Sequence, residues 1–195
     1  MKIKNISDIN NIIKDINNNK SDNSLLNDRY WSFNNLKNPT LEGLWRDSRG
    51  RIVETNYKPN DVINNTIKIP PNQKLGSNQN TENTINKIIS QYNFLLKNKS
   101  ESFYQTSTFN NILEIGGGFG AAIEVFYFNN PLLKNYINID LTETLILCAD
   151  YLIKILPSEF NIYWIDHPDE LINIPPSSKN ITLIPANIYV KYISE

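Results

Sequence analysis

Cysteine and histidine are nearly absent from the sequence, which contains one of each among 195 residues. A single cysteine, Cys148, cannot form an internal disulfide or a cysteine zinc cluster, so a scaffold held together by either is excluded. Long hydrophobic runs are also missing, because the apolar stretches are no longer than a strand or a helix. Polar residues follow Met1 where a signal peptide would need an apolar core. We therefore expect a cytoplasmic protein without a membrane partner.

An excess of charge of one sign is missing as well. The 19 basic and 20 acidic residues give a formal net charge of -1. This balance leaves no excess of positive charge that would attract nucleic acid, so a nucleic-acid partner is not expected. The length fits one domain with a sizeable core, with or without an extension at the N-terminus.

Glycine is scarce too, but four of the seven glycines fall in one stretch, Asn111 to Gly120. This stretch reads Asn-Ile-Leu-Glu-Ile-Gly-Gly-Gly-Phe-Gly. An apolar run directly before glycines indicates a buried parallel strand that turns sharply into a helix. Glycine suits such a turn because it adopts positive φ and places no Cβ between the backbone and a ligand. The stretch predicts a binding site for a nucleotide-like cofactor.

Two classes of cofactor use this kind of turn. Gly116, Gly118 and Ala121 satisfy a loose form of the dinucleotide fingerprint, in which a pyrophosphate lies at the helix N-terminus. Glu114 argues against that class, since its carboxylate would lie near an anionic pyrophosphate. S-adenosylmethionine carries a sulfonium and an ammonium group, which an acidic residue attracts. The pattern Glu114-x-Gly116-x-Gly118-x-Gly120 therefore favours the methyl donor over a nicotinamide dinucleotide.

An acidic residue follows the next expected strand. Tyr136 to Ile139 is apolar enough for a buried strand, and Asp140 stands at its carboxyl end, about 20 residues beyond the glycines, where a ribose-binding acid is expected. The alternative is that Asp140 only caps the helix that begins at Thr142.

The stretch resembles motif I of the class I S-adenosylmethionine-dependent methyltransferases. Together with Tyr136-Ile-Asn-Ile-Asp140-Leu-Thr-Glu-Thr-Leu-Ile-Leu, it is similar to the sugar O-methyltransferase family, whose second strand typically continues as Asp-Leu-Pro-Glu-Thr. Thr142 replaces that proline, and both residue types suit a helix start. The resemblance covers roughly residues 111 to 156 and extends more weakly to Ile-Pro-Ala-Asn at 184 to 187.

The resemblance implies S-adenosylmethionine as the cofactor and a sugar or another small molecule as the methyl acceptor. It implies that Glu114 orients the methionine end of the cofactor, that Asp140 holds the ribose, and that Asp166 or Asn187 hydrogen-bonds the adenine amino group. The glycines that would allow close approach of the cofactor are Gly116, Gly117, Gly118 and Gly120.

The alternation of elements predicts an α/β fold of the Rossmann-like class I methyltransferase type with a mostly parallel sheet. We expect a helical and irregular N-terminal extension at residues 1–80, beginning with an amphipathic helix that carries Ile6, Ile9, Ile13 and Ile16 on one face. Residues 81–195 would form the cofactor-binding domain. A helix after Thr81 precedes the first strand, a helix runs from Thr142 to Leu156, and further strands cover Ile162 to Ile165 and Ile181 to Ile184.

Only 85 residues follow the start of the first strand, whereas the class I fold usually has seven strands. This segment accommodates about four of them. We expect a domain that is incomplete at its C-terminus, either as a truncated product or because another chain completes the sheet. An open edge of the sheet would favour self-association.

A base that accepts a hydroxyl proton is the remaining catalytic requirement of an O-methyltransferase. His167, at the end of the third strand, is a candidate, although a solitary loop histidine is more often without a chemical role. Two alternative functions remain: a noncatalytic fragment that retains the fold, and a nicotinamide-dependent oxidoreductase. The single cysteine, Cys148, is expected to be buried in a helix.

Overall fold

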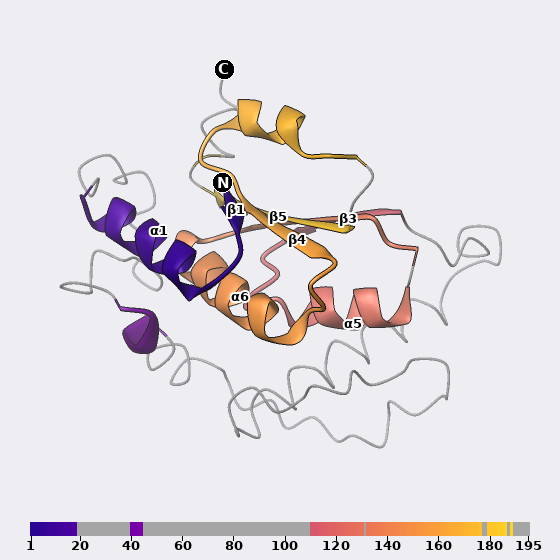
Figure 1. Cartoon of the computed structure of the whole chain (residues 1–195), viewed down its shortest axis with the longest axis horizontal. Helices are drawn as coiled ribbons and strands as arrows, with labels where there is room; N and C mark the ends of the chain where they lie inside the picture. Colours follow the sequence, from indigo (N-terminus) through magenta and orange to yellow (C-terminus); the bar gives the residue numbers. More distant parts are fainter. Residues whose placement is uncertain (19–39, 45–109, 131, 177–178, 187, 189–195) are drawn as a thin grey trace.

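A five-stranded sheet with the strand order β1-β4-β5-β3-β2 is the centre of the molecule (Figure 1). The computed structural model describes residues 1–18, 40–44, 110–130, 132–176, 179–186 and 188. The strands are β1 (Lys2–Ile3), β2 (Asn111–Ile115), β3 (Asn135–Asp140), β4 (Phe160–Trp164) and β5 (Lys179–Pro185). All four strands expected from the sequence are present, which confirms an α/β fold with a mostly parallel sheet.

Strands β2 to β5 run parallel, so their carboxyl ends meet at one edge of the sheet. Glu114 on β2 lies opposite Asn138 on β3, and Asp140 at the end of β3 lies opposite Pro185 on β5. The ends of β2, β3 and β5 are therefore neighbours, whereas the end of β4 is one strand further away from β2. This register decides which of the candidate residues can act together.

The antiparallel strand β1 was not expected from the sequence. Lys2 pairs with Tyr163 and Ile3 pairs with Ile162, which adds the first residues of the chain to the outer edge of β4. The N-terminal amine also donates a hydrogen bond of 2.7 Å to the carbonyl oxygen of Trp164. A strand of two residues is too short to show a period of two, so no sequence pattern marks it.

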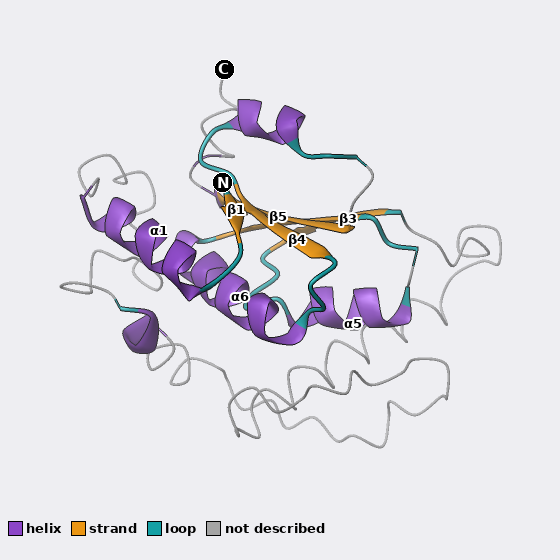
Figure 2. Ribbon diagram, in the orientation of Figure 1, coloured by secondary structure: helices purple, strands orange, loops and turns teal. Residues whose placement is uncertain are grey.

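Three helices cover one face of the sheet, as Figure 2 shows in the edge-on view. They are α1 (Ile6–Asn18), α5 (Ala121–Asn129) and α6 (Thr142–Ile155). The last two connect parallel strands and agree with the predicted helices after the glycines and from Thr142. Their inner side chains form one core with β3, β4 and β5, in which Trp164, Tyr136 and Tyr151 are the largest fully buried residues.

Helix α1 belongs to the same core, because it packs against α6. Ile9, Ile12 and Ile13 are buried, and burial of each side chain contributes roughly 1.5 to 3 kcal/mol. The predicted apolar face was wrong in one position, since Ile6 at the helix start is exposed and Ile12 takes its place in the core. The division of domains at residue 80 lies outside the described residues, as does the helix predicted after Thr81.

The opposite face of the sheet carries a smaller apolar cluster of Ile139, Ile165 and Ile184. The 3-10 helix η4 (Pro168–Asn173) lies on this side, above the sheet in Figure 1. Leu113 and Ile115 also point to this side from β2, where their exposed fractions are 59% and 71%. Of the strands that the structure describes, β2 is the last at its edge.

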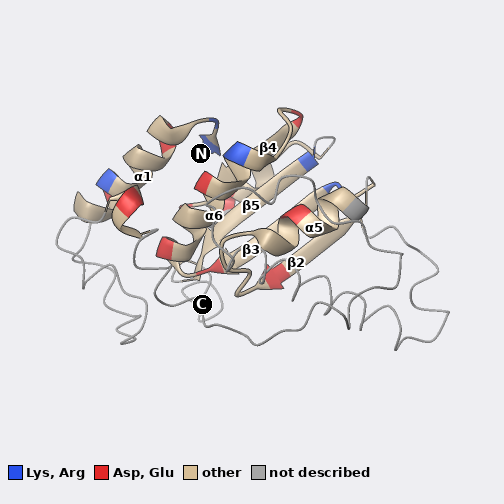
Figure 3. Ribbon diagram, turned by 90° about the horizontal axis from the view of Figure 1, so that it is seen from below, with Lys and Arg blue, Asp and Glu red and all other residues tan. Residues whose placement is uncertain are grey.

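Basic and acidic residues are interspersed over the described helices and strands (Figure 3). No described helix is both long enough and apolar enough to cross a membrane.

Candidate functional site

The loop between β2 and α5, residues 116–120, connects the edge strand to a helix whose N-cap is Gly120. Gly116, Gly118 and Gly120 adopt φ values of +78°, +61° and +93°, which other residues rarely adopt. The N–H of Gly116 donates a hydrogen bond of 2.8 Å to the carbonyl oxygen of Ile139 on β3. The turn expected from the glycines is therefore present, and it is attached to the neighbouring strand. We call residues 116–120 the glycine loop.

The four glycines of the loop face different surroundings. A Cβ added to Gly116 or Gly118 would have no heavy atom of the described residues within 4 Å apart from its chain neighbours, so the space beside both residues is open among them. A Cβ on Gly120 would lie 2.7 Å from the Cys148 Sγ, and one on Gly117 would lie 2.7 Å from the Asn138 Oδ1. Gly117 and Gly120 thus allow the loop to pack on the domain, whereas Gly116 and Gly118 leave its outer side free for a ligand.

Asp140 joins the glycine loop to the end of β3. Its Oδ2 accepts a hydrogen bond of 2.8 Å from the N–H of Gly118, and its Oδ1 accepts one of 2.7 Å from the N–H of Leu141. The N-cap of α6 is Leu141, and no side chain caps that helix. The alternative in which Asp140 acts only as a helix cap is therefore wrong, because its carboxylate bonds to the loop and to the residue before the helix.

Burial raises the pKa of Asp140, while the two N–H donors act in the opposite direction. A carboxylate has about four acceptor positions. Two acceptor positions of Asp140 are used by backbone N–H groups. The other positions can accept hydrogen bonds from the hydroxyl groups of a ligand that enters the open side of the loop.

Glu114 lies under the glycine loop on the helix-covered face of the sheet. Its Oε2 accepts a hydrogen bond of 2.7 Å from the hydroxyl of Tyr136, a fully buried residue on β3. Burial raises the pKa of Glu114; the Tyr136 hydrogen bond lowers it, and the nearby Asp140 carboxylate raises it. Two acidic side chains therefore share the space around this loop.

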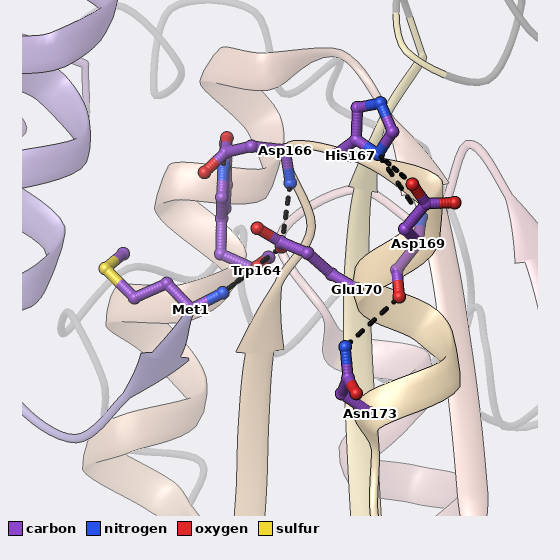
Figure 4. Close-up of polar contacts among 7 residues, drawn as sticks. All are labelled: Met1, Trp164, Asp166, His167, Asp169, Glu170 and Asn173. Carbon is purple, nitrogen blue, oxygen red and sulfur yellow. Dashed lines mark hydrogen bonds and ion pairs between the residues drawn. The ribbon is translucent and has the colours of Figure 1, made fainter.

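The end of β4 forms a separate group of polar residues (Figure 4). The Oδ1 of Asp166 accepts a hydrogen bond of 2.7 Å from the Trp164 Nε1, and the N–H of Asp166 donates to Glu170. The Nδ1 of His167 lies 3.2 Å from the Asp169 Oδ2, and both side chains are largely exposed. The candidate base thus has a carboxylate neighbour that the sequence did not suggest.

Sheet order separates this group from the glycine loop. Strand β5 lies between β4 and β3, so Asp166 and His167 are not at the strand end next to Asp140. The segment after β5 takes that place instead. Of the two residues considered for adenine, Asn187 belongs to this segment, but it lies outside the described residues.

Sequence reasoning missed Tyr136 and Asn138. Both alternate with Asp140 along β3, and both point to the same face as Glu114. Asn138 is fully buried, and its Nδ2 lies 3.7 Å from the Sγ of Cys148, whose predicted burial is confirmed. A signal was present, because polar residues two apart in an otherwise apolar strand indicate a polar cluster on one face.

A buried carboxylate lies between α5 and α6. Glu124 is 5% exposed and accepts a hydrogen bond from the hydroxyl of Tyr151, whose ring stacks edge-on against Phe119 of the glycine loop. Burial raises the pKa of Glu124, and the Tyr151 hydrogen bond opposes that effect. This pair anchors the first turn of α5 to α6.

Comparisons of the chain with models of protein families, with curated proteins and with solved structures find no match.

Proposed function

We propose that the chain binds S-adenosylmethionine at the glycine loop and is an O-methyltransferase, or the cofactor-binding half of one, of the Rossmann-like class I type. The observation that carries the proposal is the hydrogen bond between Asp140 at the end of β3 and the N–H of Gly118 in the loop that follows β2. It brings an acidic residue and a glycine turn together at the carboxyl ends of adjacent parallel strands, where open α/β sheets bind nucleotide-like ligands.

The residues present fit such a cofactor. The open space beside Gly116 and Gly118 allows a ligand to approach the backbone. Asp140 keeps acceptor capacity for ribose hydroxyls beyond its two backbone donors. The acidic pair Glu114 and Asp140 disfavours a pyrophosphate and suits a ligand with cationic groups, which is the main argument against a nicotinamide dinucleotide.

Bound S-adenosylmethionine would supply an electrophilic methyl group. The chain would contribute position, since Asp140 orients the ribose and Glu114 attracts the cationic methionine end. Removal of the acceptor proton needs a base. His167 is separated from Asp140 by β5, so we do not assign it that role, and a chain that binds the cofactor without turnover remains the alternative function.

The acceptor class follows only from the resemblance to sugar O-methyltransferases, because a fold and a cofactor do not determine the acceptor. We propose a hydroxyl of a sugar or of a sugar-containing small molecule. We also propose that the edge of β2 mediates self-association, since exposed Leu113 and Ile115 are next to it.

Isothermal titration calorimetry with S-adenosylhomocysteine and with NAD tests the cofactor. We expect the first to bind and the second not to bind. Gly118→Val should abolish binding, because the branched side chain would strain a residue at φ +61° and fill the open space beside the loop. Gly43→Ala, outside the loop, is the control and should bind like the parent. Binding of NAD alone, or unchanged affinity in a folded Gly118→Val protein, would refute the proposal.

A further inference from the structure

A polar cluster lies beneath the glycine loop, formed by the partly buried Glu114 on β2, by Tyr136 and Asn138 on β3, and by Cys148 on α6. We call it the subloop cluster. Tyr136, Asn138 and Cys148 are each fully buried. The Tyr136 hydroxyl donates to the Glu114 Oε2 at 2.7 Å, and the Asn138 Nδ2 donates to the Cys148 Sγ at 3.7 Å. The cluster approaches the loop at Gly117 and Gly120.

One acceptor of this cluster has no donor. The Oδ1 of Asn138 is buried and makes no hydrogen bond among the described residues. It lies 2.7 Å from the position that a Cβ on Gly117 would occupy. The Glu114 Oε2, which accepts from Tyr136, is the atom nearest to that position, and the Glu114 Cδ lies 2.8 Å from it. The asparagine oxygen and the Glu114 carboxyl therefore face one point under the loop. An unpaired buried acceptor typically costs about 1 to 3 kcal/mol.

A proton on Glu114 would supply a donor at this point. An ionised carboxylate only accepts hydrogen bonds, whereas a carboxylic acid has one O–H donor. With the proton, Glu114 can still accept from Tyr136 through one oxygen and offer its own hydrogen in the direction of Asn138. The protonated form thus offers Asn138 a donor that the ionised form lacks.

The charges around Glu114 also favour its protonated form. Within the part of the chain that the structure describes, the titratable groups that face it are Tyr136 and Asp140 from β3 and Cys148 from α6, and none of these is a cation. On α5 the nearest acidic residue, Glu124, bonds to Tyr151 instead. No lysine or arginine of residues 110–130 and 132–176 forms an ion pair with Glu114. Burial and the Asp140 carboxylate both raise the pKa of Glu114.

We propose that Glu114 holds a proton while the glycine loop has no ligand and releases it to solvent when a ligand with a cationic centre binds there. The O–H bond of the carboxyl group breaks, the proton passes to the buffer, and the carboxylate charge remains to balance the ligand's positive charge. This inference rests on the proposed function, and it adds that affinity for the cofactor is regulated by pH. The affinity rises with pH until Glu114 is ionised in the free protein, by up to about tenfold per pH unit for one proton released.

Tyr136 is a positioning residue in this scheme. Its hydroxyl stabilises the ionised form of Glu114, so Tyr136→Phe raises the pKa of Glu114 further. The pH profile of cofactor affinity should then move to higher pH. A merely structural role of the tyrosine would lower affinity at every pH without moving the profile.

Calorimetric titration of the full chain with S-adenosylmethionine tests the release. The titration is run from about pH 5 to about pH 8, in pairs of buffers with different ionisation enthalpies, so that the number of protons released is measured directly. We expect about one proton for S-adenosylmethionine and none for adenosine, which lacks the cationic end. Glu114→Gln keeps the size of the side chain without its titration, and should bind with no proton release and a flat pH profile.

The outcomes separate the two proposals. Failure of S-adenosylmethionine to bind at any pH overturns the proposed function and the ligand-linked release with it. Binding without proton release in the parent at every pH overturns this inference alone. Infrared difference spectra of the ligand-free parent and Glu114→Gln proteins at the lowest pH of the series provide the second measurement. A carbonyl band of a protonated acid that is lost in Glu114→Gln supports the inference, and an unchanged band region overturns it.

Discussion

The carboxylate of Asp140 bonds to the backbone of Gly118, 22 positions earlier in the chain, at a distance of 2.8 Å. Through this contact the end of β3 supports the glycine loop. The acidic residue is therefore part of the loop's own structure, in addition to the ribose contact that we propose for it. Its removal should affect both the stability of the loop and the binding of a ligand.

Substitution of Asp140 tests this double role. Asp140→Ala removes a charged acceptor from two N–H groups and should weaken S-adenosylhomocysteine binding by about 2 to 3 kcal/mol. It should also lower the free energy of unfolding by about 1 kcal/mol, since the N–H of Gly118 loses its acceptor. Calorimetric titration and urea unfolding measure the two effects.

Asp140→Asn is the matched control for size. Asparagine has one carbonyl oxygen in place of two carboxylate oxygens, so it can accept from Gly118 or from Leu141 but repels the other N–H with its own amide hydrogens. We expect an intermediate loss of affinity. A folded Asp140→Asn protein with the affinity of the parent would contradict the ribose contact.

Gly117 is predicted to be intolerant of a side chain for reasons of packing. Gly117→Ala places a methyl group 2.7 Å from the Asn138 Oδ1 and 2.8 Å from the Glu114 Cδ. Overpacking of this kind typically costs about 1 to 3 kcal/mol, which urea unfolding can measure. In an Asn138→Ala background one of the two blocking side chains is absent, so the cost should be smaller. An equal cost in both backgrounds would show that the contact is not the cause.

Glu124 should make the stability depend on pH. Burial raises its pKa above that of the unfolded chain, so the folded protein binds the proton more tightly. The resulting stabilisation is complete below the pKa of the unfolded chain, about 4.3, and is lost as the pH rises through the higher pKa of the folded state. Glu124→Gln removes this titration and keeps an acceptor for Tyr151.

Urea unfolding of the parent and Glu124→Gln proteins at a series of pH values measures how the free energy of unfolding changes with pH. The advantage of the variant over the parent should grow as the pH rises. The exposed Glu159 provides the matched control, Glu159→Gln. An advantage of Glu124→Gln that shrinks with rising pH would refute the expectation.

The open edge of β2 leads to a prediction about assembly. Ile115, with 71% of its surface exposed, stands at the end of an edge strand that carries no lysine or proline to discourage pairing. The parent should associate as its concentration rises, and Ile115→Lys should remain monomeric in sedimentation velocity runs. Ile172→Lys changes a more exposed isoleucine away from the sheet and should associate like the parent. A parent that stays monomeric would contradict the prediction.

Local patterns were sufficient to predict the elements that surround the site. The glycines predicted the turn between β2 and α5, and Asp140 was expected at the end of a strand, where it lies. These features depend on a few adjacent residues whose backbone requirements are specific. Helix α6, predicted from Thr142, is likewise confirmed within one residue at its end.

Contacts between distant segments could not be predicted in the same way. The insertion of β5 between β4 and β3 separates His167 from Asp140, and no local pattern encodes which strands become neighbours. The hydrogen bond from Tyr136 to Glu114 depends on the register of β3 against β2. The role of Asp140 as only a helix cap was wrong for a related reason. Its carboxylate accepts a hydrogen bond from the N–H of Gly118, which belongs to another part of the chain.

The pairing of β1 with β4 has a consequence for the order of events during synthesis. Met1 and its partner Trp164 are 163 positions apart. At roughly 5 to 20 residues per second, a ribosome needs about 8 to 30 seconds to make the intervening chain. Until residues 142–155 have been made, the buried isoleucines of α1 lack the helix α6 against which they pack in the finished domain. The residues of α1 are thus made before the neighbours that cover them, which gives chaperones an apolar segment to bind.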